Sequence, residues 1–209
     1  MSPFRGHPST SRARCVTHNL CLRCASLGLG CCSRCRPFIL AEDLRLLLKN
    51  YSTEEVKAIV EVGLIPAMYL HHLLDPEMNQ IYYFWENAYY RLQTRFLKGS
   101  CVALVPGKGC GLGNSRPLIC RVWPFWWKSG SNPSRDNFLI EINGDCTMAT
   151  LWSMSPGEIL REFRYSENEL RKDLLTMSKA LKEHGEILKE AAKRRIPPNE
   201  LLNWILNAI

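Results

Sequence analysis

Apolar residues recur every three or four positions over the last quarter of the chain, which is the period of an amphipathic helix. This stripe consists of Leu170, Leu174, Met177, Leu181, His184, Leu188 and Ala191. It follows the capping box Ser166-Glu-Asn-Glu169 and precedes Pro197-Pro198, which predicts one helix of about 28 residues. We interpret His184 as a packed histidine. Gly185 costs about 1 kcal/mol relative to Ala in a helix and permits a bend.

Shorter periodic segments surround this helix. A second capping box, Ser155 to Glu158 with Pro156 at the first helical position, predicts a helix before it. After Pro198, an amphipathic turn is expected to fold back on the long helix. Residues 39–50, with Glu42 and Asp43 in the opening turn, and residues 52–63, capped by Ser52 and Glu55 and ending at Gly63, predict two more helices.

Strand patterns occupy the middle of the chain. Residues 100–106 and 138–146 are short β-branched or alternating runs, and each predicts a strand. The aromatic run from Ile81 to Tyr90 fits both periods, and we predict strand in its first part and helix in its second. Aromatic rows can stack nucleic-acid bases, but core packing is the commoner reason for them.

The 209 residues carry a net charge of +7, and residues 1–19 form a basic segment without periodicity. No secretory signal or stretch of about 18 uncharged apolar residues is present, so we expect a cytoplasmic protein with no membrane partner. A protein that bound two divalent ions through eight thiolates would keep a net charge of only about +3. The basic charge is therefore weak support for nucleic acid, and we expect none as a partner.

Ten cysteines provide the candidate chemistry. In a cytosolic chain they favour metal over disulfides, although a disulfide-stapled protein stays an alternative. Cys21 and Cys24 have the C-x2-C spacing of zinc ligands. Cys31 and Cys32 are adjacent, so we expect them to point towards two metals or towards two sides of one cluster. Cys35 forms a further C-x2-C pair with Cys32.

A second set of cysteines lies downstream, around the stretch from Cys110 to Phe125. Its glycines and prolines predict a loop with few conformations, which suits a metal site. A hairpin between Cys101 and Cys110 would bring both within reach of the same ion. Arg116 and Arg121 are expected either to support the ligands or to form surface ion pairs. We expect four aromatic residues to shield the site from water: Trp123, Phe125, Trp126 and Trp127.

These motifs together resemble the YkgJ-like cysteine-cluster family, described as zinc- or iron-chelating. The shared wording is C-x2-C, a Cys-Cys pair, a cysteine in a short apolar strand and Arg-Pro-x2-Cys-Arg-x2-Pro-Phe, over about residues 21–148. The spacer before Cys31 is longer than in the family. The resemblance implies eight metal ligands: Cys21, Cys24, Cys31, Cys32, Cys101, Cys110, Cys120 and Cys146. Cys15 is interpreted as a stray thiol, and His71-His72 as packed or surface residues.

The sequence therefore predicts an α+β protein, with an irregular metal-centred module of short helices and a small antiparallel sheet. The predicted units are a basic tail over 1–19, a cysteine-cluster domain over 20–150 and a helical extension over 151–209. The expected cofactor is zinc or iron, and self-association or a protein partner is expected at the C-terminal helix. The alternative function is that of an iron–sulfur protein with redox or S-adenosylmethionine-dependent methyl-transfer activity. No catalytic constellation is legible.

Overall fold

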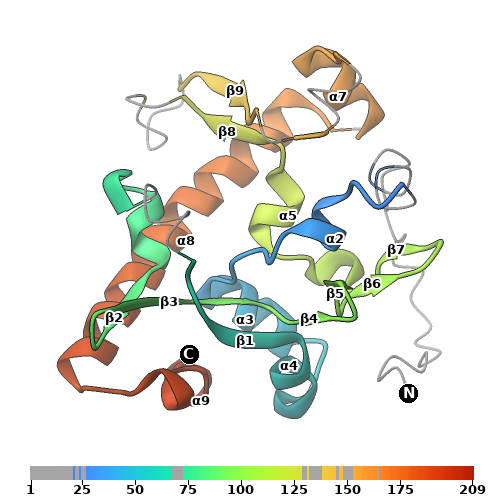
Figure 1. Cartoon of the computed structure of the whole chain (residues 1–209). Helices are drawn as coiled ribbons and strands as arrows, with labels where there is room; N and C mark the ends of the chain where they lie inside the picture. The colour runs from blue at the N-terminus through green and yellow to red at the C-terminus, as the bar shows by residue number, and fades with distance from the viewer. Residues whose placement is uncertain are drawn as a thin grey trace.

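The computed structural model describes residues 21, 24, 27–66, 73–128, 131, 138–144, 146–147, 153–163 and 165–209. Over these residues the chain is a mixed α+β structure with small antiparallel sheets and a long C-terminal helix, as expected from the sequence (Figure 1). The helices are α2 (Cys31–Arg34), α3 (Ala41–Leu48), α4 (Thr53–Ile59), η2 (Met78–Ile81), η3 (Gly113–Ser115), α5 (Leu118–Val122), α7 (Pro156–Glu162), α8 (Glu167–Lys193) and α9 (Pro198–Ala208). Among the described residues, none of these helices combines the length and the apolar character that crossing a membrane requires.

The strands are short. They are β1 (Val60–Leu64), β2 (Tyr83–Trp85), β3 (Ala88–Thr94), β4 (Phe96–Leu97), β5 (Ser100–Cys101), β6 (Leu104–Val105), β7 (Gly109–Cys110), β8 (Phe125–Trp127) and β9 (Ile140–Ile142). The largest sheet has the order β1-β3-β2, and β4-β5, β6-β7 and β8-β9 form separate two-stranded ribbons. Ribbons of this size are marginal by themselves, so the segments that carry Cys101 and Cys110 depend on other contacts.

The aromatic run from Ile81 to Tyr90 forms a hairpin, so the predicted helix in its second part is wrong. Glu86 and Asn87 both have positive φ, 43° and 65°, and Trp85 pairs directly with Ala88 across them. A two-residue turn with positive φ at both positions matches the twist of the flanking strands. Asn87 is the residue in the sequence that favours this turn, because asparagine tolerates positive φ. The helical spacing of the neighbouring aromatic residues led to the wrong prediction.

The helix predicted over 52–63 begins as expected, but it ends at Ile59. Ser52 Oγ accepts from the Glu55 N–H at 3.3 Å, and Glu55 Oε2 accepts from the Ser52 N–H at 2.8 Å. From Val60 the chain continues as β1, in register with β3 from Val60–Thr94 to Leu64–Tyr90. Pairing with β3 therefore overrides the glycine stop that the sequence suggested at Gly63.

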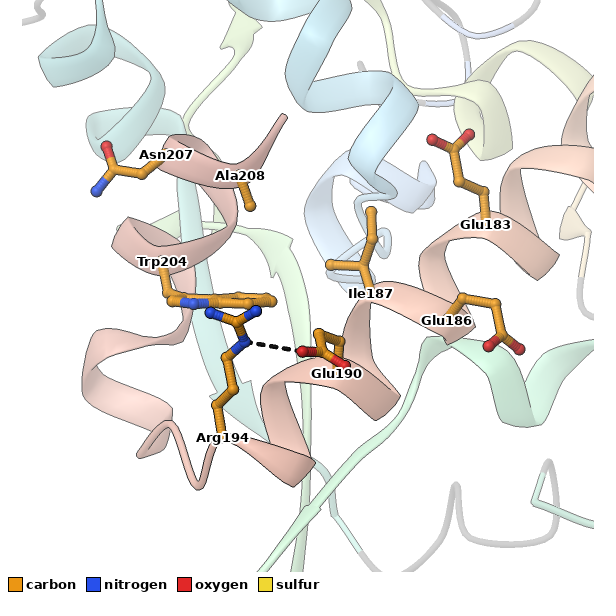
Figure 2. A pocket seen from close by; sticks show the side chains of 8 residues that line it. All are labelled: Glu183, Glu186, Ile187, Glu190, Arg194, Trp204, Asn207 and Ala208. Carbon is orange, nitrogen blue, oxygen red and sulfur yellow. Dashed lines mark hydrogen bonds and ion pairs between the residues drawn. The ribbon is translucent and has the colours of Figure 1, made fainter.

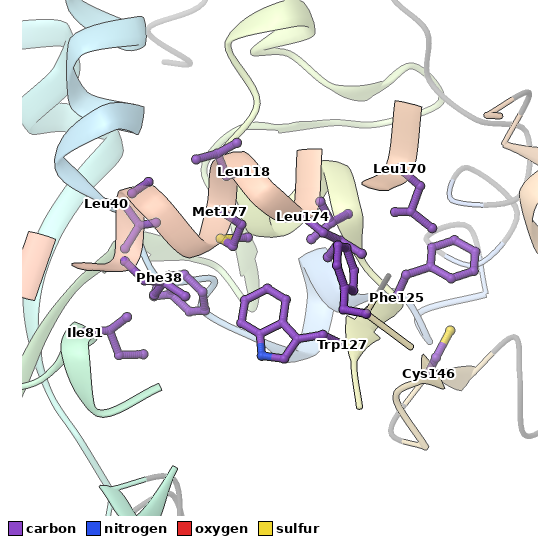
Figure 3. Close-up of a cluster of buried hydrophobic side chains, with 14 of the residues drawn as sticks. Phe38, Leu40, Ile81, Leu118, Phe125, Trp127, Cys146, Leu170, Leu174 and Met177 are labelled. Atoms are coloured by element: carbon purple, nitrogen blue, oxygen red, sulfur yellow. The ribbon is translucent and has the colours of Figure 1, made fainter. Parts of the chain in front are cut away.

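Helix α8 crosses the molecule and packs against α3, α5, η2 and β2 (Figure 1). All seven residues of the predicted stripe are buried along it. One hydrophobic cluster joins Leu170, Leu174 and Met177 of α8 to Leu118 of α5 and Phe125 of β8 (Figure 3). A second cluster lies under the β1-β3-β2 sheet and α9. Helix α8 is thus part of the core that packs against α5.

Helix α8 continues through Gly185, and close packing explains this glycine. A Cβ built there would lie 1.9 Å from Gln80 Oε1 and 3.2 Å from Gln80 Cβ, because η2 packs directly on α8. We expect Gly185→Leu to destabilise the protein by about 1–3 kcal/mol through overpacking, which exceeds the helix-propensity gain of up to about 1 kcal/mol. Urea unfolding measures the loss. A second change, Gln80→Ala, should recover much of it, and no recovery would contradict the packing explanation.

His184 on α8 is completely buried, and its Nδ1 accepts the Ala41 N–H at 3.2 Å. Desolvation lowers the pKa of His184 from 6.5 to about 4, and Glu183 opposes that shift only weakly. The folded protein therefore holds the His184 imidazole in its neutral form at neutral pH. Unfolded chains bind this proton at a higher pH than folded ones, so its contribution is intact above about pH 6.5 and is lost as the pH falls towards 4.

We therefore expect acidification from about pH 7 to about pH 4 to reduce the unfolding free energy of the wild type more than that of His184→Gln. Urea unfolding measures the difference in unfolding free energy between the two proteins at each pH. Titrating groups that both proteins share cancel in this difference. Asp43 is one of them, since its raised pKa favours folding as the pH falls. Parallel pH profiles for both proteins would contradict the expectation.

Candidate metal centre

The nine described cysteines are all free thiols, and the fold places them in one region. Cys31 and Cys32 begin α2, which packs on the β5 strand that carries Cys101. Cys110 ends β7, Cys120 lies in α5 and Cys146 follows the turn after β9. Figure 1 shows α2 beside α5 and close to strands β5 to β7. The two cysteine sets are far apart in sequence, but α2 packs on β5, and Cys32 and Cys110 both pack against the hydrophobic cluster that contains Cys101.

Four thiols, which we call the inner group, come from α2, β5, β7 and α5: Cys32, Cys101, Cys110 and Cys120. The pKa of Cys32 is raised to about 12, first by desolvation and then by Cys101, Cys110 and Cys21. Desolvation also raises the pKa of Cys120 well above its ordinary value, followed by Cys110, Cys32 and Cys101. Cys101 is buried in the second hydrophobic cluster, and Cys32 and Cys110 pack against it. The register pairs Leu104 with Cys110, so the predicted hairpin exists, but Cys101 lies just before it in β5.

Four further thiols, which we call the outer group, share electrostatic interactions with Cys146: Cys21, Cys24, Cys31 and Cys146 itself. Cys24 and Cys146 are buried together in the first hydrophobic cluster. The residue Cys21 is exposed, yet desolvation raises the pKa of its thiol to about 11, with Cys24 and Cys146 adding to the rise. Cys21 also interacts with Cys110 and Cys32 of the inner group.

Cys35 caps α2 and adjoins the outer group. A hydrogen bond with Cys35 is the main cause that raises the pKa of Cys31, followed by desolvation, Cys35 itself, Cys120 and Cys146. The Cys35 N–H also donates to Cys31 O at 2.7 Å. The interaction of Cys31 with Cys120 shows that the inner and outer groups adjoin.

The thiols are gathered without forming a coordination shell. Within the described part of the chain, no group of three or more Cys, His, Asp or Glu side chains is arranged to hold a metal ion. The chemistry of the donor set suits zinc, iron or an iron–sulfur cluster, because all three take thiolates. Cys15 and His71-His72 lie outside the described residues, so those interpretations stay predictions.

The loop predicted from Cys110 to Phe125 is wrong over Leu118–Val122, which form helix α5. Buried Asp43 connects α5, which carries Cys120, to α3. Its Oδ1 accepts the Leu118 N–H at 2.7 Å, and its Oδ2 accepts the Leu40 N–H at 2.9 Å. Desolvation raises the pKa of Asp43 to about 6, although both backbone bonds and Arg121 favour the charged form. Nearby, Asn50 Nδ2 donates to Ser115 Oγ at 3.0 Å. The sequence placed Asp43 in a helix opening turn, but nothing in it indicated the bond to α5.

We expect Asp43→Asn to lower the unfolding free energy by about 1–3 kcal/mol. The two N–H groups bond different carboxylate oxygens, and asparagine replaces one of these oxygens with an NH2 group, which donates and cannot accept. Chemical denaturation provides the measurement. Glu42→Gln in the same turn is the matched control, since its ion pair with Arg45 is partly exposed and worth little. Equal effects of the two changes would contradict a bridging role for Asp43.

Arg116, which follows η3, and Arg121, which lies in α5, have different surroundings. Arg116 lowers the pKa of Cys21, Cys32 and Cys120 through its charge, and its Nη2 donates to Cys120 O at 3.2 Å. Arg116 is therefore a cation that faces the thiols. Arg121 instead acts on Asp43 and on Tyr165, and its buried Nε lacks a hydrogen-bond partner within the described part of the chain.

The aromatic residues after Cys120 lie in the core. Phe125 and Trp127 are buried in the first hydrophobic cluster (Figure 3). Trp123 and Trp126 pack against this cluster and are partly exposed. Cys24 and Cys146 belong to the same cluster. The predicted function of the four aromatic residues as a shield from water stays a prediction.

A groove of about 550 Å³ lies between α8 and α9, and no cysteine lines it. Figure 2 shows three glutamates of α8, Glu183, Glu186 and Glu190, and the Trp204 indole of α9. Each glutamate forms an ion pair, with Arg45, Lys189 and Arg194 respectively. The expected protein partner or self-association at the C-terminal helix stays a prediction.

Comparison of the chain with protein-family models, with curated proteins and with solved structures finds no match.

Proposed function

We propose that this protein binds zinc or iron through thiolates from two cysteine sets that are separated in the sequence. The observation that carries the proposal is the packing of α2, which bears Cys32 of the first set, on β5, which bears Cys101 of the second. Cys32 and Cys110 both pack against the hydrophobic cluster that contains Cys101. The resemblance to the YkgJ-like family supports the same function and implies the eight ligands given above. In this proposal the protein is a metal-centred module, and the described residues provide the thiols and their supporting contacts.

The surroundings of the thiols favour a bound cation over free thiolates. Four thiolates around one divalent ion leave a net charge of −2, and Arg116 lies where it can offset this charge for Cys32 and Cys120. Without a metal, desolvation and the neighbouring thiols keep these groups protonated. Binding would therefore release protons as the metal replaces them.

The alternative proposal is an iron–sulfur protein with redox or methyl-transfer chemistry, which would use the same thiols. Anaerobic purification followed by metal analysis and visible absorption separates the two. A colourless protein with zinc supports a zinc centre, and a brown protein whose absorption bleaches on reduction supports the iron–sulfur alternative. A reduced protein that takes up neither metal would overturn both proposals, and a lack of free thiols after denaturation would support disulfides.

A further inference from the structure

Positive charge is concentrated on β3 and on the segment that pairs with it. Residues 32–38 and 91–98 contain several cations and no acidic residue, and backbone hydrogen bonds join the two segments. They bring together three arginines, which we call the basic patch: Arg36, Arg91 and Arg95. Two further cations, Arg34 and Lys98, flank the patch in the sequence, and both are exposed.

The three arginines of the patch meet around one carboxylate, that of Glu61 on β1. Arg36 Nη1 lies 3.1 Å from Glu61 Oε1, and Arg95 Nη1 lies 3.8 Å from Glu61 Oε2. Arg91 Nη2 donates to Arg36 O at 3.0 Å. Three guanidinium groups around one carboxylate leave the cluster with a net charge of +2.

Gln93 joins Arg91 to Glu61 across the sheet. Its Oε1 accepts from Arg91 Nε at 3.3 Å, and its Nε2 donates to Glu61 Oε1 at 3.3 Å. Gly63 lies opposite Arg91 in the register, and a Cβ built there would lie 2.0 Å from Gln93 Nε2. The missing side chain at Gly63 therefore makes room for the network that holds the arginines together.

The guanidinium groups remain accessible to a ligand. The side chains of Arg36 and Arg95 are 50% and 48% exposed. Because a guanidinium group has five N–H donors, a bond to Glu61 leaves donors for a second anion. Exposed ion pairs are also weak, so Glu61 competes little with a phosphate. Lys57, whose carbonyl accepts from Arg95 Nε, pairs with Glu54 and adds no net charge.

Phe96 orients one of these guanidinium groups. Arg36 Cζ lies 5.5 Å from the centroid of the Phe96 ring, which is within the range of a cation–π contact. Phe96 itself is held by its pairing with Cys101 and by the second hydrophobic cluster. Nucleic-acid bases stack on guanidinium planes as well as on aromatic rings. The half-exposed Arg36 side chain can therefore present its plane to a base.

An aromatic pair lies further along the same face of β3. Tyr89 is two positions before Arg91, so both side chains leave the sheet on the same side. Phe84 is opposite Tyr89 in the register, their ring centroids are 4.9 Å apart, and Phe84 is 54% exposed. This face of the sheet therefore combines an exposed ring with a row of guanidinium groups.

We propose that the basic patch binds a single-stranded nucleic acid. Its phosphates contact Arg36, Arg91 and Arg95, and its bases stack on the Arg36 guanidinium plane and on the Phe84 ring. Single strands are favoured over duplexes because their unpaired bases can stack on side chains. The net charge of the sequence was weak support for such a partner, since it does not show where the cations lie. This activity is separate from the proposed metal binding.

The test is fluorescence anisotropy with the full chain, purified anaerobically with its metal. The probes are labelled oligouridylate and oligodeoxythymidylate of about ten nucleotides. Three phosphate contacts predict that the logarithm of the binding constant falls with the logarithm of the salt concentration with a slope of about −2. Arg36→Ala and Arg95→Ala should each weaken binding of both probes and reduce that slope by about 0.7. The tighter probe identifies RNA or DNA as the ligand.

A matched control removes one cation outside the patch. Lys189→Ala changes an exposed residue of α8 that pairs with Glu186, and it should leave the slope and the affinity unchanged. Circular dichroism establishes that each variant is folded. An effect of Lys189→Ala equal to that of Arg95→Ala would overturn the patch, because binding would then depend on net charge alone.

Two further variants separate stacking from charge. Arg36→Lys keeps the cation but loses the plane, so we expect weaker binding at an unchanged slope. Phe84→Ala should weaken binding by about 5-fold or more, again at an unchanged slope. Wild-type affinity in both variants would overturn the stacking contacts and, with them, the preference for single strands.

The remaining outcomes concern other anions and the metal. Oligoglutamate or vesicles containing phosphatidylserine that bind as tightly as the oligonucleotides would overturn nucleic acid as the ligand. If Arg36 and Arg95 only offset the charge of metal-bound thiolates, their alanine variants would lower the metal content and leave oligonucleotide binding unchanged, which also overturns the inference. A protein without metal that still binds through the patch would contradict the proposed function and support this inference.

Discussion

A strong chelator is expected to unfold the cysteine-bearing part of the protein, with a loss of order 10 kcal/mol for each structural ion removed. The elements that carry the thiols are too small to be stable by themselves. Helix α2 has four residues, and β5 and β7 have two each. A helix this short lacks the length to stabilise itself, so metal–thiolate bonds would supply much of its folding free energy.

The measurement is denaturant unfolding of the reduced protein, followed by circular dichroism and tryptophan fluorescence. The control is the same chelator saturated with zinc, which keeps the solution conditions but cannot remove the ion. Trp127 reports on the affected region, because it is buried in the cluster that contains Cys24 and Cys146. A protein that contains no metal and still unfolds cooperatively in strong chelator would contradict the proposed function.

Leu174→Ala is expected to lower the unfolding free energy by about 2–5 kcal/mol, the range for removing a fully buried leucine side chain. Leu174 is 0% exposed and lies in the same cluster as Leu118 of α5 and Phe125 of β8. The cavity would therefore open between α8 and the segment that presents Cys120. We expect lower stability and, if the proposed function holds, faster loss of metal.

Two matched variants test this effect. Leu174→Met conserves most of the volume and should cost less than about 1.5 kcal/mol. Lys179→Ala changes an exposed position of the same helix and should remain within about 0.5 kcal/mol. Urea unfolding of all three proteins gives the comparison. A loss for Leu174→Ala no larger than that for Lys179→Ala would show that α8 does not support α5.

Elements with local signals were predictable from the sequence. The capping boxes at Ser155 and Ser166 begin α7 and α8 as expected, with Ser Oγ accepting from the N–H three residues later. The apolar stripe of α8 is buried as its period required. Both signals involve residues within one or two turns of each other, so no knowledge of the rest of the chain was needed.

Predictions failed where distant pairing decided the outcome. Residues from Val60 leave the helical pattern because β3 offers them a partner more than 25 positions away, with Val60 opposite Thr94. The hairpin at Glu86 and Asn87 is a related case, since positive φ at both residues is stabilised by the strands on either side. The local propensities of these residues do not reveal which strands they pair with.

The sequence by itself determined which chemistry is available, through ten cysteines and their spacing, and where the capped helices α4, α7 and α8 begin. Only the tertiary structure decided which thiols meet, because Cys32 reaches Cys101 and Cys110 through the packing of α2 on β5. It also decided that Asp43 fixes the segment of Cys120 by bonding the Leu118 N–H. Contacts between residues 69 or more positions apart depend on how whole elements pack, and spacing along the chain does not contain that information.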